Sequence, residues 1–243
     1  DEAGAHEVAA EILAAGGRAS AFACDVTSEE SIRLAAAGAE AALGTIDILM
    51  NNAGILSGGN PEDIPVSAWQ QMMDVNFFGM VRAIELLLPH MLARGHGHIV
   101  NTASFAGLYP FASSRIHYAA SKAAVLSMSE NLALYCLPYG VQVSCLAPGP
   151  VMTTSVQGMK HYSETYAMRA PGSHLTVKSQ AETARILADG MEAGKILIPT
   201  HDELWATLVE RAANPDDYIR AKAAQFAAGD SGRPQVPPEF LAG

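Results

Sequence analysis

The chain has 243 residues, of which 49% are hydrophobic and 16% charged, a composition that excludes an intrinsically disordered protein. Its formal net charge of −10 argues against nucleic acid as a partner, because a nucleic-acid-binding domain is expected to be basic. The length suits one α/β domain with a large core, extending over residues 1–243.

The sequence also gives expectations about compartment, membrane and metal. No uninterrupted apolar run is long enough to cross a bilayer, and the first residues lack the basic and apolar parts of a signal peptide. Cys24, Cys136 and Cys145 form no C-x-x-C motif, and we expect buried thiols in a reducing cytoplasm. The eight histidines show neither H-x-x-x-H nor H-x-x-E-H spacing. We therefore expect a cytoplasmic protein with no metal site and no membrane partner.

Helix and strand signals alternate along most of the chain. Apolar residues at helical spacing predict helices, and short, nearly unbroken apolar runs predict strands that helices cover on both faces. In the first part of the chain we predict a helix over 2–15, a strand over 19–24, a helix to about 43 opened by a capping box at Thr27-Ser-Glu-Glu30, and a strand over 46–50. A helix capped by Ser67 and running to Met91 follows, then a strand over 99–102, a helix over 118–137 and a strand over 141–146. The last elements are a helix from Ser179 to Gly194, a strand over 195–198, and two helices that start at Thr200 and Asn214.

This alternation predicts the fold class. Strand, helix, strand in repetition implies right-handed crossovers and a doubly wound parallel sheet, a Rossmann-like α/β domain. In such sheets ligands bind at the carboxyl ends of the strands. The candidate site therefore consists of the segments that follow the predicted strands: Asp25-Val26, Asn51-Asn-Ala-Gly54, Thr102-Ala-Ser104 and Pro148-Gly149-Pro-Val-Met-Thr153.

The most informative motif is Tyr118-Ala-Ala-Ser-Lys122. Residues four apart lie on one face of a helix, with Cβ atoms roughly 6 Å apart. Ser104 ends the strand before this helix, so a phenol, an ammonium and a hydroxyl converge on one proton-transfer site. A second Tyr-x-x-x-Lys, from Tyr218 to Lys222, has no strand-borne serine before it. We interpret that later pair as an exposed helix face.

Taken together, these residues resemble the short-chain dehydrogenase/reductase family over about residues 1–155. Each match is weak alone, but all occur in the order of the family and at nearly its spacing. They are Asp25-Val26, Asn51-Asn-Ala-Gly54, Asn76 in Met73-Asp-Val-Asn-Phe-Phe-Gly, Ser104 three residues before Gly107, Tyr118 with Lys122, and Pro148-Gly149 with Thr153.

The resemblance implies an oxidoreductase that moves a hydride between NAD or NADP and an alcohol or ketone. Tyr118 is then the acid/base and Ser104 orients the carbonyl, while Asn76 holds a water in a proton relay. The free tyrosine pKa, near 10, is too high for efficient exchange at neutral pH. Lys122 is expected to lower the pKa of Tyr118 and, by the resemblance, to bond the nicotinamide ribose.

The resemblance also assigns binding residues. For the cofactor these are Asp25 at the adenine amino group, Val26 at its ring, Val151 and Thr153 at the carboxamide, and also Asn52, Ala53, Gly54, Tyr118, Lys122, Pro148 and Gly149. For an apolar small-molecule alcohol or ketone they are Ser104, Tyr118, Tyr109 and Met159, with residues 154–178 as the substrate loop. Residues 200–243 form a helical extension and tail, and the family implies a homodimer or homotetramer.

Alternatives remain open. Ser104 could be a helix or turn cap, Asn76 a buried amide that stabilises its helix, and Asp25 a cap of the following turn. The chain could also be a non-catalytic nucleotide-binding relative, or an epimerase or dehydratase on the same scaffold. The complete set of Asn76, Ser104, Tyr118 and Lys122 argues against the first alternative, since a sensor has no need for all four. The Asn-Asn-Ala-Gly turn favours the simple dehydrogenase.

The family begins with a strand, a glycine-rich turn that cradles the pyrophosphate, and a second strand. No G-x-x-x-G-x-G occurs before Asp25. Without those strands the sheet has a gap of roughly 10 Å beside residues 46–50, with unpaired backbone groups and bare apolar helix faces. We therefore expect the chain to be the latter part of a polypeptide roughly 30 to 35 residues longer. The residue that selects NAD or NADP then lies outside it.

Overall fold

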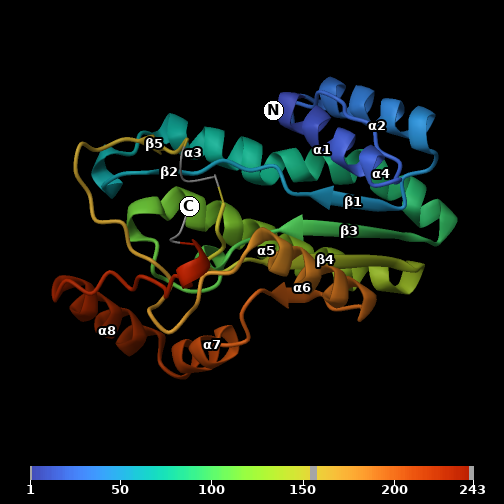
Figure 1. The fold of residues 1–243 in the computed structure, drawn as a ribbon. Helices are drawn as coiled ribbons and strands as arrows, with labels where there is room; N and C mark the ends of the chain where they lie inside the picture. The colour runs from blue at the N-terminus through green and yellow to red at the C-terminus, as the bar shows by residue number, and fades with distance from the viewer. Residues whose placement is uncertain (1, 154–157, 241–243) are drawn as a thin grey trace.

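A computed structural model describes residues 2–153 and 158–240 (Figure 1). It contains one four-stranded sheet in the order β1-β3-β4-β6, in which every pair of neighbours is parallel. The strands are β1 (Ile48–Asn51), β3 (Gly97–Thr102), β4 (Val141–Ala147) and β6 (Leu197–Pro199). This is the predicted Rossmann-like arrangement, and it brings the carboxyl ends of the four strands to one end of the sheet.

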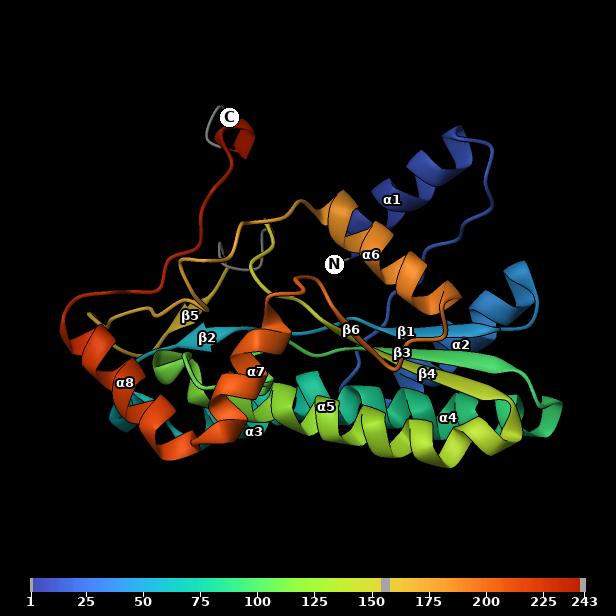
Figure 2. The same ribbon diagram turned by 90° about the horizontal axis from the view of Figure 1, so that it is seen from below.

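The helices form layers on both faces of this sheet. Figure 2 shows α4 and α5 on one face and α6 on the other. Two short strands, β2 (Ser57–Gly58) and β5 (Lys160–His161), form a separate parallel pair that the sequence does not predict. The helices are α1 (Glu2–Ala14), α2 (Glu29–Leu43), α3 (Val66–Met73), α4 (Gly79–Arg94), α5 (Ile116–Cys136), α6 (Gln180–Glu192), α7 (Leu204–Ala213) and α8 (Pro215–Ala227).

Helices α3 and α4 form one long helix joined by a π-helical turn over Asp74–Phe78. Its cap is Pro65 rather than the predicted Ser67. Among the described residues, Val66–Arg94 is long and apolar enough to cross a membrane by length and composition alone, a test that core helices also pass. Here α4 packs on the sheet, where Met91 joins Ile99 and Val141 in the core. A π turn is rare and is frequent at functional sites, and this one contains Asn76.

One predicted strand and one predicted cap in the first part of the chain are wrong, although the helix to about residue 43 is confirmed as α2. Residues 19–24 form no strand, since they pair with no strand in the described ranges. The cap of α2 is Ser28, whose hydroxyl accepts a hydrogen bond from the Ser31 backbone N–H, because Thr27 is used by the preceding turn. Cys24 is exposed on the same irregular segment, so the expectation of three buried thiols holds only for Cys136 and Cys145.

The C-terminal helices α7 and α8 pack against the segment that follows β3. The caps at Ser179 and Asn214 are confirmed, but α7 begins only at Leu204, after Thr200 and a buried His201. Tyr218 of α8 is buried in a core cluster that includes Leu204, Phe105 and Tyr109. The interpretation of the second Tyr-x-x-x-Lys as an exposed helix face was therefore wrong for Tyr218. Lys222, one turn further along α8, places its Nζ 5.6 Å from the centroid of the Tyr218 ring.

Strand β1 lies at the edge of the sheet. Within the described ranges it pairs only with β3, and Ile48 and Met50 are 52% and 50% exposed. A groove of about 340 Å³ runs between this edge and helices α2 and α4, lined mainly by apolar side chains such as Ile32, Ala39 and Leu87. This is the gap predicted beside residues 46–50. The expectation of a longer polypeptide stays a prediction.

Candidate active site

Four side chains predicted to act together meet beyond the carboxyl end of β3. Ser104 follows that strand, and Tyr118 and Lys122 come from the first two turns of α5. Asn76 enters from the π turn and is fully buried. A Cβ built on Gly54, just after β1, would lie 3.3 Å from Asn76 Oδ1 and 3.7 Å from Lys122 Nζ. One glycine backbone therefore adjoins both groups, and the chain brings the predicted set together.

Ser104 has two roles. Its hydroxyl accepts a hydrogen bond of 3.2 Å from the Ala106 backbone N–H, so it caps the single turn Phe105–Gly107. It also hydrogen-bonds the Tyr118 phenol. The capping alternative is thus observed, and it orients the hydroxyl without preventing its contact with the phenol.

Tyr118 has a phenol whose pKa is set mainly by burial. Burial raises its pKa above the ordinary tyrosine value, and the hydrogen bond with Ser104 and the Arg115 guanidinium act in the opposite direction. The positive charge that acts on this phenol in the protein alone is that of Arg115, and the lowering of the Tyr118 pKa by Lys122 stays a prediction. In the protein alone the phenol keeps its proton, which is the form that can donate to a carbonyl oxygen.

Lys122 is a buried ammonium, only 4% exposed. Its Nζ donates a hydrogen bond of 2.7 Å to the Thr102 carbonyl and lies 5.9 Å from the centroid of the Tyr118 ring. Burial lowers the pKa of Lys122 to about 8, against a smaller opposite effect from Cys145. Because Thr102 is the last residue of β3, this bond fixes the ammonium at the end of the strand.

Asn76 uses its amide to brace the loop after β1. Its Oδ1 accepts a 2.7 Å hydrogen bond from the Ile55 backbone N–H, and its Nδ2 donates to the Ile55 carbonyl at 3.1 Å. The same Nδ2 donates to Ser121 Oγ at 3.2 Å, which links the π turn to α5. The buried-amide alternative is therefore observed. The proton-relay role stays a prediction.

The ends of β1 and β4 supply backbone at the site. Asn52, Ala53 and Gly54 are exposed after β1, with Asn52 accepting a hydrogen bond from Thr102 Oγ1 at 2.9 Å.

After β4, the Pro148 carbonyl accepts a hydrogen bond from the Phe105 N–H, and the Gly149 N–H donates to Thr200 Oγ1. A Cβ on Gly149 would lie 2.7 Å from His201 Nδ1, so packing requires this glycine. Val151 bridges to Lys178, and Thr153 is exposed.

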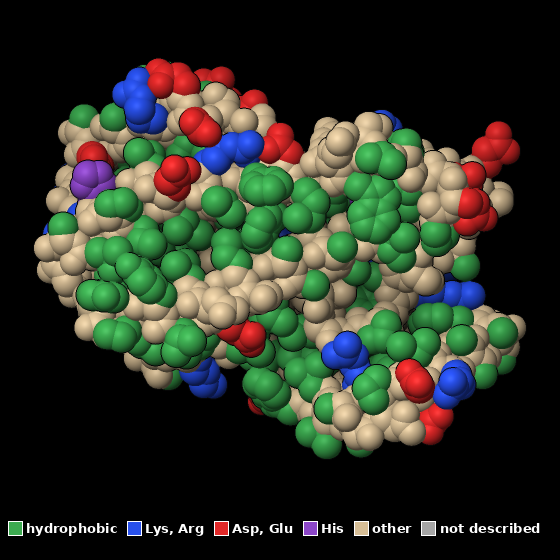
Figure 3. Space-filling view, turned by 180° about the vertical axis from the view of Figure 1, so that it is seen from behind, with side chains coloured by type: hydrophobic (Ala, Val, Ile, Leu, Met, Phe, Trp, Pro, Cys, Tyr) green, Lys and Arg blue, Asp and Glu red, His purple; other side chains and the backbone are tan. Residues whose placement is uncertain are grey.

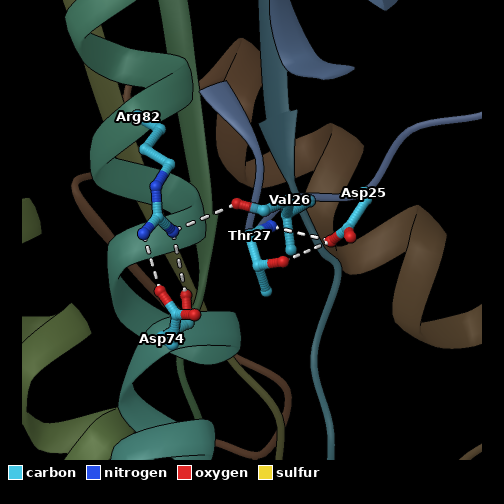
Figure 4. A network of polar contacts seen from close by, with 5 residues as sticks. All are labelled: Asp25, Val26, Thr27, Asp74 and Arg82. Atoms are coloured by element: carbon cyan, nitrogen blue, oxygen red, sulfur yellow. Dashed lines mark hydrogen bonds and ion pairs between the residues drawn. The ribbon is translucent and has the colours of Figure 1, made fainter. Parts of the chain in front are cut away.

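Asp25 and Val26 form a tight turn against α4 (Figure 4). The Asp25 carboxylate accepts hydrogen bonds from the Thr27 N–H at 2.9 Å and its hydroxyl at 2.8 Å, which lower the pKa of Asp25. Arg82 donates to the Val26 carbonyl and pairs with Asp74 at 2.7 Å. Asp25 thus caps the turn, as the alternative held, and its carboxylate remains exposed for a further contact.

The predicted substrate residues are only partly at the site. Tyr109 is buried in the core, and its hydroxyl donates to the Pro171 carbonyl at 3.1 Å, so its assignment to the substrate site is not supported. The aromatic cluster of Phe105, Tyr109 and Phe111 explains this burial. Met159 is also buried, whereas Met168 of the same loop is half-exposed. Residues 154–157 of the predicted substrate loop lie outside the described residues.

Two residues beside Tyr118 were missed by the reasoning from sequence. Arg115 acts electrostatically on both Tyr118 and Tyr166, and Ser121 bonds Asn76. The signal for Arg115 was its spacing, three residues before Tyr118 on a helix. His117, between them, is fully buried with Nε2 2.6 Å from Ser57 Oγ, so it anchors α5 to β2.

Comparison with known proteins identifies a family whose match includes these site residues. A profile of the short chain dehydrogenase family matches residues 1–163. Trans-4-hydroxycyclohexanecarboxylate dehydrogenase of Sinomonas cyclohexanicum is 37% identical over 136 residues, which are 56% of this chain and 52% of that enzyme. The short-chain reductase NovJ of Streptomyces niveus is 32% identical over 231 residues, 93% of this chain and 78% of that protein.

Solved structures give the same result. A short chain dehydrogenase/reductase of Burkholderia phymatum in complex with NAD superposes with a TM-score of 0.76 at 26% identity, over 89% of this chain and 83% of that chain. The chain spans about half the length of the Sinomonas relative. With the profile match over most of the chain and the motifs assembled in one place, the chain belongs to the short-chain dehydrogenase/reductase family.

Proposed function

We propose that this protein interconverts a secondary alcohol and a ketone with NAD or NADP as the hydride carrier. The observation that carries the proposal is the convergence of Ser104, Tyr118, Lys122 and Asn76 beside the exposed backbone of Gly54. The structurally similar enzyme of Burkholderia phymatum was solved with NAD, which supports this class of cofactor.

The nicotinamide end of such a cofactor fits these residues. Gly54 lacks the Cβ that would meet Asn76 and crowd Lys122, so a ribose can approach the ammonium there. Asn52 to Gly54, Tyr118, Lys122 and the backbone from Pro148 to Val151 would hold it. When bound, the cofactor supplies or accepts the hydride.

The side chains of the chain itself then handle the proton. Tyr118 donates its phenolic proton to the oxygen of the ketone, and Ser104 orients that oxygen by a hydrogen bond. The Ala106 N–H holds Ser104 in place from behind. Lys122, fixed by the Thr102 carbonyl, keeps a positive charge close to the phenol when the phenol has lost its proton. In the oxidation direction the same groups act in reverse.

The proposal is tested by following the absorbance of reduced nicotinamide with NADH and NADPH over a panel of ketones. Net cofactor oxidation that depends on the ketone supports it. A non-catalytic binder gives no turnover, and an epimerase or dehydratase recycles its cofactor and gives no net change. Either result contradicts the proposal. The relatives are named for different alcohols, so the panel has to include cyclic, aliphatic and acidic ketones.

The substrate body is expected to be apolar, as the loop composition around Met159 and Met168 suggests. A series of ketones with lengthening alkyl chains measures this. We expect kcat/KM to rise with each buried methylene, by about threefold to fourfold at roughly 0.8 kcal/mol each. If kcat/KM does not increase along the series, the prediction of an apolar substrate body is wrong.

The charge of Lys122 gives an expected pH dependence. Its pKa of about 8 means that the ammonium loses its proton as the pH rises through that value. We expect cofactor affinity, measured by fluorescence titration, to fall about tenfold from about pH 7 to about pH 9.5, because charge-assisted hydrogen bonds are lost. The fall should be absent in Lys122→Met and present in Lys222→Met. An affinity that rises with pH would contradict this role.

We also propose that the protein forms a homodimer or homotetramer. The face over α4 and α5 carries a broad apolar area with few charges (Figure 3). Near the end of α5, Leu134 and Tyr135 are 75% and 56% exposed. If a second copy covers this face, light scattering gives a multiple of 25.5 kDa for the wild type and a smaller mass for Leu134→Glu. A wild-type monomer would contradict the assembly.

A further inference from the structure

The segment just before Tyr118 has an unusual concentration of unpartnered polar atoms. Among the described residues, the buried side-chain atoms without a hydrogen-bond partner include Ser114 Oγ, Arg115 Nε and His117 Nδ1. These three residues lie within four consecutive positions at the start of α5. A buried polar group without a partner costs about 1 to 3 kcal/mol, so such atoms are normally few and scattered. Their position beside the proposed acid points to recognition of a substrate.

Arg115 is the charged member of this group. Its Nη2 donates to the Arg169 carbonyl at 2.5 Å, and no other hydrogen bond of the guanidinium occurs within the described ranges. No carboxylate of residues 2–153 or 158–240 forms an ion pair with it. A partly buried cation without a counter-ion is costly, and an arriving anion would remove that cost.

The surroundings of Arg115 place this charge at the reaction centre. The guanidinium interacts electrostatically with the phenols of Tyr118 and Tyr166. Tyr166 lies against the loop of β2, where a Cβ on Gly58 would be 2.8 Å from its hydroxyl and 3.3 Å from the Ser114 carbonyl. The charge of Arg115 therefore acts on both the proposed proton donor and a second tyrosine, close enough to meet a substrate that reaches Tyr118.

We propose that Arg115 binds a carboxylate of the substrate, so that this enzyme acts on a hydroxy acid or keto acid with an otherwise apolar body. This inference rests on the function proposed above, since it takes Tyr118 as the group that meets the carbonyl. Guanidinium is the side chain that matches a planar carboxylate with two parallel donors, and it stays charged at all physiological pH values. Ser114, with its buried unpartnered hydroxyl, is placed to contribute a further hydrogen bond.

The test compares one keto acid with its methyl ester. We use 4-oxocyclohexanecarboxylate and the ester, measuring binding by calorimetry and turnover by nicotinamide absorbance, with the full chain in each case. The variants are Arg115→Met and the matched control Arg169→Met. The Arg169 backbone carbonyl accepts the hydrogen bond from Arg115, but the Arg169 side chain lies over the Phe226 ring at 4.7 Å. Both variants keep the Arg169 backbone carbonyl, which is the acceptor of this hydrogen bond.

Wild-type protein should bind the acid about tenfold or more tightly than the ester, as expected for a charge-assisted pair. Arg115→Met should abolish this ratio, and Arg169→Met should keep it. A ratio near one in the wild type, or a ratio that survives in Arg115→Met, overturns the inference. A merely structural role for Arg115 would weaken acid and ester alike. Binding preference without any turnover would refute the proposed function and leave the carboxylate site supported.

Discussion

Replacing Tyr118 by Phe is expected to abolish hydride transfer. The substitution keeps the ring and removes only the hydroxyl, so the site loses its proton donor while the fold is retained. Because a positioned acid or base contributes about 10²- to 10⁴-fold, turnover should fall by that factor. Cofactor affinity should change far less, by no more than about tenfold for one lost hydrogen bond, since Lys122 and the backbone after β1 are intact. Single-turnover absorbance and a fluorescence titration measure the two quantities.

The second Tyr-x-x-x-Lys offers a matched control for this experiment. Tyr218 is also a buried tyrosine, its hydroxyl has no hydrogen-bond partner in the described chain, and it lies in the core beside α7. Tyr218→Phe should therefore leave turnover unchanged. A Tyr118→Phe protein that keeps a tenth of wild-type turnover would remove Tyr118 from the role of acid.

Gly107→Ala is expected to be the most damaging small substitution near the site. A Cβ at Gly107 would lie 2.6 Å from the Ala123 nitrogen and 2.6 Å from the Lys122 carbonyl carbon. Both are backbone atoms of α5, which cannot rotate away as a side chain can. We expect a loss of about 3 kcal/mol in the free energy of unfolding, roughly 6 to 12 °C in Tm for a chain of this size. The helix that carries Lys122 and Tyr118 should shift as well.

The control for that substitution is Gly158→Ala. Nothing lies within 4 Å of a Cβ there, so its unfolding temperature should match that of the wild type. Denaturation followed by circular dichroism measures both variants. A Gly107→Ala protein as stable as Gly158→Ala would show that the turn Phe105–Gly107 does not pack against α5 as described.

The sequence predicts the fold and the reacting side chains because each depends on local pattern. Strands β3 and β4 are short apolar runs. Tyr118 and Lys122 are four residues apart, so one turn of helix is enough to bring them to the same face. The strand over 19–24 fails for a non-local reason. Its residues have strand composition, but a strand requires a partner, and the described chain gives none.

The electrostatics of the site could not be predicted in the same way. The effect of Arg115 on Tyr118 depends on where the Arg115 side chain points, which the sequence does not show. In the structure the Arg115 guanidinium acts on the phenol, while the Lys122 ammonium donates to the Thr102 carbonyl. Tyr109 fails similarly. Its apolar neighbours in sequence fit a substrate pocket or a core equally well, and only the packing of Phe105 and α7 decides for the core.

The most direct test of the account is a crystal structure with a reduced nicotinamide cofactor bound. We predict that the ribose hydroxyls of the nicotinamide half lie within hydrogen-bond distance of Lys122 Nζ and the Tyr118 phenol, with the ring near the backbone from Pro148 to Val151. A cofactor bound elsewhere, with the Tyr118 hydroxyl remote from the nicotinamide, would contradict the account.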